Sequence, residues 1–454
     1  MQTLPQYIKA NFSNYIEELK EFLKIPSIST TSENKSDMRR AANFVADKLK
    51  AAGLNKTEVY STEGYPIVYG EWLGAPGKPT ILIYGHYDVQ PADPIELWKS
   101  NPFKPEIRDG KIYARGATDD KGQLYIHIKS VEAFFKVKGS LPLNVKFLIE
   151  GEEEIGSPSL NTFIKQNKEI LKCDTILISD TALYAPGIPT ITYGLRGLSY
   201  LEVEITGPNR ELHSGDYGGA VGNPVNVLAE MIAKLHDKNY KINIPHFYDD
   251  VLKLTKAERD NFKRLKFSDR AFAKEIGLKE LYGEKGFSTL ERLWARPTLD
   301  CNGVYGGYTG KGAKTVIASN AVAKISLRIV PNQNPIKIAR LVTKHIKSIT
   351  PKCMKVKVTN LQGAYPVITP LKHKATIAAS KAMSQAFGKK TVYMREGASI
   401  PIVATFASVL KSPSVLMGFG LNTENLHSPN EHFSLRHFQL GIISSAKFIE
   451  EYSK

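Results

Sequence analysis

The stretch TILIYGHYD, residues 80–88, is the part of the sequence that decides the fold. It opens with an apolar run of strand length and closes with two polar side chains, His86 and Asp88, where such a strand would end. Further apolar runs of the same kind follow along the chain, at residues 145–149, 175–178 and 414–417. Each of them also has a polar, metal-ligating type of side chain at or beyond its carboxyl end.

Helical patterns surround these runs. Residues 1–50 are largely helical in their spacing of apolar side chains, and residues 124–135 show the same spacing. Strands that alternate with helices favour a largely parallel sheet covered on both faces. We therefore predict an α/β catalytic domain, a mostly parallel sheet flanked by helices, whose ligands bind beyond the carboxyl ends of the strands.

The middle of the chain has a different pattern. Residues 200–205 and 325–329 alternate between apolar and polar side chains, which is typical of a sheet with one solvated face. Helical patterns follow at residues 225–235 and 336–349, each just after a proline. We expect an inserted α+β lid or dimerisation domain at 195–360, between catalytic parts at 1–194 and 361–454. The charged, helix-prone segment 238–296 receives no role.

The polar residues at the strand ends form one inventory: His86, Asp88, Asp119, Asp120, Glu153, Glu154, Asp180 and His427. Taken singly, each has an ordinary interpretation as a turn, cap or surface residue. Their joint placement at successive strand ends indicates a metal site instead. Imidazoles with carboxylates suit zinc, manganese or cobalt, and the set supplies the ligands and the spare carboxylate that a two-metal hydrolase needs.

The composition argues against several classes of protein. The 454 residues carry a net charge of +16, but the lysines are dispersed, and this favours charge for solubility over nucleic-acid binding. The chain shows no apolar run of membrane-spanning length and no basic leader before an apolar run. Its three cysteines, Cys173, Cys301 and Cys353, are too scattered for a disulfide framework or a thiolate site. We expect a cytoplasmic protein. A binding protein that had lost catalysis would lack a ligand or the base, and none is missing.

Longer motifs contain these residues. They are GHYDVQP at 85–91, RGATDDKG at 115–122, EGEEEIGS at 150–157, YGLRG at 193–197, LHSGDYGG at 212–219 and REGASIP at 395–401. The set resembles the aminoacylase/carnosinase-type metallopeptidases, a family that includes acetylornithine deacetylase, succinyl-diaminopimelate desuccinylase and a glutamate-releasing carboxypeptidase. It covers nearly the whole chain and is most similar to the cytosolic dipeptidase branch.

The resemblance implies roles at the metals. His86 and Asp180 would complete one metal site and Glu154 and His427 the other, with Asp119 bridging both. It also implies a cis peptide bond between Asp119 and Asp120. Glu153 would be the general base that activates a bridging water. Independently of the resemblance, residues i and i+2 of a strand share a face, so Asp88 could orient the ring of His86. Because 152–154 is a run of three acids, a slip of one residue would move the base to Glu152.

The resemblance implies further roles in the insert. His213 would reach the active site of a partner subunit in a homodimer and stabilise the oxyanion of the tetrahedral intermediate. Arg328 is either a solvated strand arginine or the clamp for the substrate's carboxylate. Weaker substrate contacts fall on Thr315, Arg395 and Ser399.

Two reactions remain open. The first is hydrolysis of a short peptide with a free C-terminus by a dipeptidase or carboxypeptidase with two divalent ions, where Zn²⁺ is favoured and Mn²⁺ or Co²⁺ are alternatives. The second is N-acyl-amino-acid deacylation, as in acetylornithine deacetylase or succinyl-diaminopimelate desuccinylase. The motifs contain several of the expected metal ligands, but they do not indicate which acyl group the substrate pocket accepts.

Overall fold

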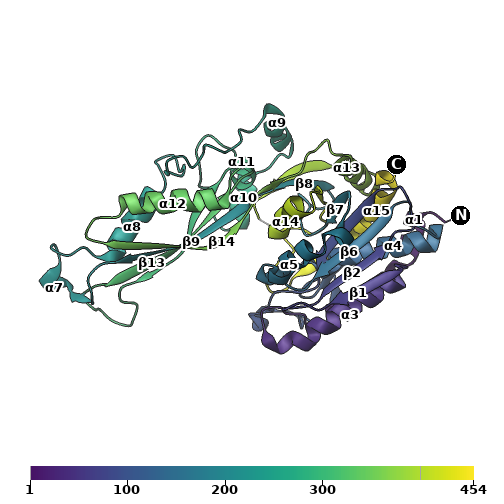
Figure 1. The fold of residues 1–454 in the computed structure, drawn as a ribbon, viewed down its shortest axis with the longest axis horizontal. Helices are drawn as coiled ribbons and strands as arrows, with labels where there is room; N and C mark the ends of the chain where they lie inside the picture. The colour runs from purple at the N-terminus through teal and green to yellow at the C-terminus, as the bar shows by residue number, and fades with distance from the viewer. Residues whose placement is uncertain (1, 399) are drawn as a thin grey trace. The chain divides into compact units, whose positions relative to one another are not determined.

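A computed structural model describes residues 2–398 and 400–454, and the chain forms two compact units (Figure 1). The first unit runs to Tyr193 and is completed by Thr369–Met394 and Thr405–Lys454; the second comprises Gly194–Ile368 and Arg395–Ala404. The strand-and-helix fold predicted from the sequence is confirmed. The three-part domain division stays a prediction, as does the role of the insert as a lid or dimerisation domain.

The first unit is built on a sheet with the strand order β1-β2-β6-β3-β7-β17-β8, and β15, which belongs to the second unit, and β16 also pair with β8. Strands β3, β6, β7 and β17 are parallel, whereas β1, β2 and β8 join antiparallel. The bounds are β1 Lys56–Tyr60, β2 Ile67–Trp72, β3 Thr80–His86, β6 Asn144–Glu150, β7 Thr175–Ile178, β8 Thr190–Leu195, β15 Val367–Ile368, β16 Val392–Glu396 and β17 Ser414–Leu416.

Helices cover this sheet. They are α1 Leu4–Ala10, α2 Phe12–Leu23, α3 Lys35–Ala51, α4 Lys121–Lys138, α5 Pro158–Gln166, α6 Lys168–Leu171, α13 Lys374–Phe387, α14 Pro401–Val409 and α15 Leu435–Tyr452. Helix α4 contacts α1, α2, α3, α15 and strand β3, and it is buried nearly all round. Its two buried lysines are therefore paired: Lys121 donates to the carbonyl oxygens of Phe22 and Ile25, and Lys129 binds Glu18 and Glu132.

The parallel strands bring their carboxyl ends to one edge of the sheet. The four predicted apolar runs all form strands, β3, β6, β7 and β17. Beside this edge, a small antiparallel sheet in the order β18-β5-β4 holds the last loop of the chain in place. Its strands are β4 Glu106–Arg108, β5 Lys111–Tyr113 and β18 His432–Ser434.

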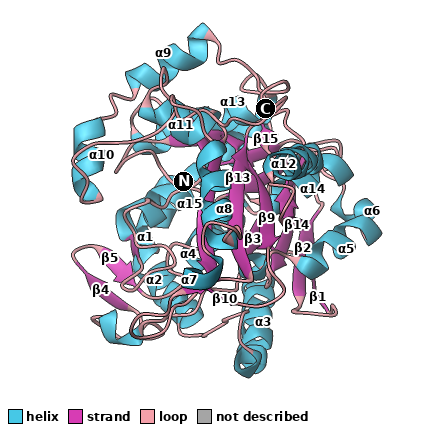
Figure 2. Cartoon of the chain, turned by 90° about the vertical axis from the view of Figure 1, so that its left-hand side faces the viewer, coloured by secondary structure: helices cyan, strands magenta, loops and turns pink. Residues whose placement is uncertain are grey.

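The second unit is an antiparallel sheet in the order β11-β13-β9-β14, with α8 and α12 on one face (Figures 1 and 2). Buried and partly exposed residues alternate along β9, as the sequence predicted. Both helices begin as expected at a proline, after Asn223 and Asn334, whose side chains cap the first turn. The strands are β9 Gly197–Thr206, β10 Leu212–His213, β11 Thr298–Gly306, β12 Val316–Ile317, β13 Asn320–Ile329 and β14 Lys355–Ala364.

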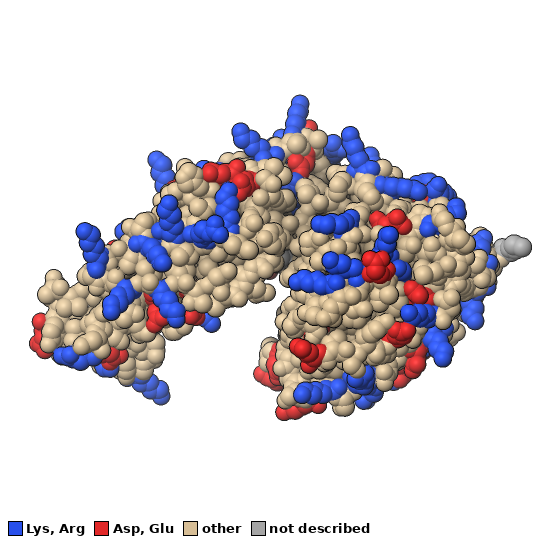
Figure 3. Space-filling view, in the orientation of Figure 1, with Lys and Arg blue, Asp and Glu red and all other residues tan. Residues whose placement is uncertain are grey.

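The segment 238–296 forms three short helices of this unit. The helices of the second unit are α7 Ser214–Tyr217, α8 Pro224–Lys234, α9 Lys256–Arg264, α10 Asp269–Glu275, α11 Thr289–Ala295 and α12 Pro335–Ile349. On the face shown in Figure 3, lysine and arginine side chains are dispersed among acidic ones. Within the described ranges, no helix is both long and apolar enough to span a bilayer.

Candidate metal centre

His86 ends strand β3 and is fully buried. Its Nδ1 lies 3.1 Å from the carbonyl oxygen of Asp88 and 3.3 Å from Asp88 Oδ1. Because both neighbours are acceptors, Nδ1 carries a proton, and the other ring nitrogen, Nε2, faces Asp119 Oδ1. Burial disfavours the charged ring, but hydrogen bonds to Asp119 and Asp88 raise the pKa of His86 well above its ordinary value. The ring is therefore oriented as a metal-binding imidazole requires.

Asp119 lies between two imidazoles. Its Oδ1 is 3.1 Å from His86 Nε2, and its Oδ2 is 2.8 Å from His427 Nε2. The Asp119–Asp120 peptide bond is cis, which confirms the expectation from the resemblance. Asp120 does not cap helix α4 with its side chain; its Oδ2 accepts the backbone N–H of His86 at 3.3 Å. A carboxylate whose two oxygens face two different rings can serve two ions at once.

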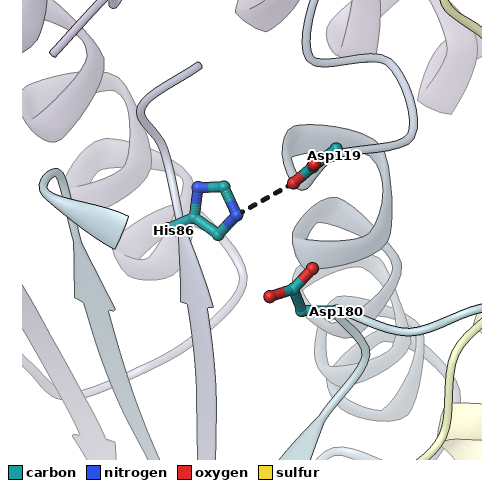
Figure 4. Close-up of side chains that lie close together, drawn as sticks. All are labelled: His86, Asp119 and Asp180. Atoms are coloured by element: carbon teal, nitrogen blue, oxygen red, sulfur yellow. Dashed lines mark hydrogen bonds and ion pairs between the residues drawn. The ribbon is translucent and has the colours of Figure 1, made fainter. Parts of the chain in front are cut away.

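Two candidate ligand groups share Asp119. The first ligand group is His86, Asp119 and Asp180 (Figure 4), and the second is Asp119, Glu154 and His427. Within each group, one ligand atom per residue lies within 4.8 Å of the others. In Figure 4 the three side chains of the first group point toward one another from the ends of β3 and β7 and from the turn before α4.

The donor set fits divalent cations. Burial, followed by the charge of Asp119, raises the pKa of Asp180 to about 6 and that of Glu154 to about 9. At Asp180 the charges of His86 and His427 offset the burial and the carboxylate repulsion only in part, so the group is short of positive charge. Oxygen and imidazole ligands suit zinc, manganese or cobalt, and a divalent ion would supply the missing charge.

The turn after β6 places Glu153 and Glu154 beside these groups. Asp88 Oδ1 accepts the backbone N–H of Glu153 at 3.2 Å, and Asp88 Oδ2 accepts that of Glu154 at 3.1 Å. Burial raises the pKa of Glu153 well above its ordinary value, and the charges that act on it include His86 and Asp180. The carboxylate of Glu152 is used elsewhere, since it accepts hydrogen bonds from the backbone of Tyr65 and Ser159.

Three predicted residues lie in the second unit. His213 ends β10 and is exposed; its Nδ1 accepts the N–H of Gly215 at 3.1 Å. Thr315 lies beside it, where its carbonyl oxygen accepts the N–H of Ser214. Arg328 lies on β13, and its pKa is lowered by burial although Asp300 partly compensates. The metal ligands belong to the first unit, whereas these three residues belong to the second.

Arg395 and Ser399 are the two other residues that were predicted to contact the substrate. Arg395 is buried, and its Nη2 forms an ion pair with Glu258 of α9. Ser399 lies outside the described residues.

Two residues that support the candidate ligands through hydrogen bonds were not identified from the sequence. Glu431 accepts hydrogen bonds from the backbone of Thr118 and Asp119, and Gln90 donates to Glu154 Oε2 at 2.8 Å. Gln90 falls inside the GHYDVQP motif, which was a usable signal. No comparable signal marked Glu431.

Two histidine–carboxylate groups that share an aspartate at the carboxyl edge of a parallel sheet, with a spare glutamate alongside, define a metallohydrolase. The chain belongs to peptidase family M20/M25/M40, whose model matches residues 82–451. This confirms the expected metallopeptidase family, and the protein is a hydrolase.

Its relatives include dipeptidases. The human Beta-Ala-His dipeptidase is 31% identical over 99% of this chain and 92% of its own length. The structure of the dipeptidase Dug1p from Saccharomyces cerevisiae matches with a TM-score of 0.84 at 31% identity, covering 99% of this chain and 98% of that one. The metallo-carboxypeptidase Sso-CP2 from Sulfolobus solfataricus matches with a TM-score of 0.86 at 34% identity, covering 97% and 99%.

Proposed function

We propose that the protein is a metallodipeptidase that cleaves the peptide bond before a free C-terminal residue. The observation that carries this proposal is the position of Asp119 between His86 and His427, with Glu153 and Glu154 on the adjoining turn. The names of the relatives, Beta-Ala-His dipeptidase and Dug1p dipeptidase, support a dipeptide as substrate, and Sso-CP2 supports longer peptides as a neighbouring possibility.

The ligand assignment follows the two groups. His86 and Asp180 would hold one ion, Glu154 and His427 the other, and Asp119 would contact both. Divalent ions, with Zn²⁺ favoured over Mn²⁺ or Co²⁺, would polarise the scissile carbonyl and lower the pKa of a water molecule. Asp88 would keep His86 in the tautomer that exposes Nε2.

Glu153 would be the general base. Its carboxylate would take a proton from the attacking water and then deliver it to the leaving nitrogen, so the residue needs a pKa near the working pH when the site is loaded. Burial raises that pKa, and bound cations would bring it down again. Glu152 is a poor candidate because its oxygens already accept hydrogen bonds from Tyr65 and Ser159.

The second unit would supply substrate contacts. Because His213 Nδ1 accepts the Gly215 N–H, its Nε2 carries the proton and could donate to an oxyanion. Arg328 would pair with the substrate carboxylate, and Thr315 and Ser399 would make further substrate contacts, whereas the ion pair with Glu258 favours a structural role for Arg395.

We further propose a cytoplasmic homodimer in which His213 serves the partner subunit. Sedimentation of the purified protein tests the assembly: a dimer is expected, and a monomer that hydrolyses dipeptides at full rate would contradict the shared site.

A substrate screen tests the activity. Metal-free protein would be reloaded with zinc, manganese or cobalt and offered dipeptides, longer peptides, and N-acetyl and N-succinyl amino acids. Cleavage of dipeptides with a free carboxylate, and none of their C-terminal amides, is the expected result. Cleavage of N-acyl amino acids alone would overturn the dipeptidase proposal in favour of a deacylase.

A further inference from the structure

Glu431 is a fully buried carboxylate that accepts four hydrogen bonds from one short segment. Its Oε2 accepts from Arg115 Nη1 at 2.7 Å and from the Gly116 N–H at 2.9 Å. Its Oε1 accepts from the N–H groups of Thr118 and Asp119 at 3.0 and 3.1 Å. Each oxygen therefore accepts two hydrogen bonds, and all four donors belong to residues 115–119.

Two other buried side chains join the same segments. Glu424 Oε2 accepts from Thr118 Oγ1 at 2.7 Å. Gln123 donates to the carbonyl oxygen of Thr118 at 3.1 Å and accepts the N–H of Phe419 at 2.7 Å. The turn that carries Asp119 is therefore tied at several points to residues 419–431.

The loop 421–431 needs this support. It carries His427, and Asn425, His427 and Asn430 all have positive φ, at 57°, 58° and 62°. Such backbone conformations persist where the surroundings hold them. The His427 side chain is 54% exposed, so packing around the ring does little to fix its position. Apart from the contact of its Nε2 with Asp119, the position of His427 therefore depends on the backbone of the loop.

We propose that Glu431 is a positioning residue for the second ligand group: it fixes the backbone of 116–119 against the loop of His427, and so keeps Asp119 and His427 side by side as ligands of one ion. Glu424 and Gln123 reinforce the same connection. Glu431 acts through the backbone of Asp119, whose Oδ2 lies 2.8 Å from His427 Nε2, and it is not one of the proposed metal ligands. The inference rests on the ligand assignment proposed above.

The test is the metal affinity of the Glu431→Gln protein. Glutamine keeps the volume but turns one acceptor into an amide N–H₂, which would face two of the four donors. Loss of such a supporting contact typically weakens metal binding by about tenfold to a hundredfold. We would measure the zinc Kd by chelator competition, and the hydrogen exchange of the 116–119 amides in the metal-free protein.

The matched control is Glu284→Gln, which breaks a buried arginine–carboxylate pair with Arg296 in the second unit. We expect weaker zinc binding and faster amide exchange in Glu431→Gln, with activity restored at high zinc, and an unchanged zinc Kd in the control. A zinc Kd within twofold of wild type would overturn the inference. If wild type itself bound no zinc, the proposed function would fail instead.

A milder variant covers the case in which Glu431→Gln does not fold. Thr118→Val removes the Oγ1 hydrogen bond to Glu424 and keeps the side-chain shape. We expect a several-fold rise in the zinc Kd, and an unchanged Kd would overturn the inference equally.

Discussion

Replacing Asp88 by asparagine tests how the centre is positioned. Asp88 is fully buried, and its carboxylate receives three groups: the His86 ring at 3.3 Å and the backbone N–H groups of Glu153 and Glu154 at 3.2 and 3.1 Å. The His86 and Glu153 contacts go to Oδ1 and the Glu154 contact to Oδ2. Asparagine fits the same space with one acceptor oxygen fewer.

The size of the effect follows from these contacts. The favourable orientation of the amide keeps its oxygen at the Oδ1 position, which leaves the partly buried Glu154 N–H facing an N–H₂ group. An orphaned buried donor costs about 1–3 kcal/mol, and the remaining contacts lose the assistance of a charge. We expect a total of about 2–4 kcal/mol in transition-state stabilisation, which corresponds to a fall in kcat/KM of roughly 30- to 900-fold.

Steady-state kinetics on a dipeptide at saturating metal measures this loss, together with the metal Kd. The matched control is Asp109→Asn, which makes the same change of charge at an exposed residue and should leave kcat/KM within twofold. If Asp88→Asn kept more than a third of wild-type kcat/KM, Asp88 would not position His86 and the catalytic turn.

Three further predictions concern the proposed general base Glu153, the buried His127 and the proposed carboxylate-binding Arg328. Glu153→Gln should lower kcat by about 10²- to 10⁴-fold with metal binding retained, while Glu152→Gln should keep most activity; the reverse order would move the base to Glu152. Burial lowers the pKa of His127 to about 3. Between pH 6.5 and 3 this histidine is therefore protonated in the unfolded chain but neutral in the native state. The free energy of unfolding should therefore fall by up to about 1.4 kcal/mol per pH unit between pH 6.5 and 3, and urea titrations of metal-free His127→Gln should lack this part of the slope; parallel pH profiles for the two proteins would refute it. Arg328→Ala should raise KM for free-carboxylate dipeptides by about 10- to 150-fold, on the basis of 1.5–3 kcal/mol for a charged hydrogen bond, and an unchanged KM would remove Arg328 from the substrate site.

The local pattern of apolar and polar residues was enough to predict the strands and the candidate ligands at their carboxyl ends. The apolar runs that form β3 and β7 are short, continuous and bounded by polar residues, so their length and composition determine their structure. Parallel strands then bring His86 and Asp180 together without further information. The cis bond before Asp120 has no local signature and came from the family resemblance alone.

What the sequence could not predict is contact between a side chain and a distant backbone. Glu431 binds the N–H of Asp119, 312 residues away, and any buried acid could have made that contact. Arg395 was expected at the substrate, yet it pairs with Glu258 in a segment to which the sequence assigned no role. Such partners are set by tertiary packing, which spacing along the chain does not encode.

In the proposed centre, Asp119 joins two metal ions. An anomalous difference map from crystals of the zinc-loaded protein tests it directly. We predict two peaks per chain, each about 2.0–2.2 Å from a carboxylate oxygen of Asp119, one beside His86 and Asp180 and the other beside Glu154 and His427. A single peak, or two peaks of which one lies beyond bonding distance of Asp119, would contradict the account.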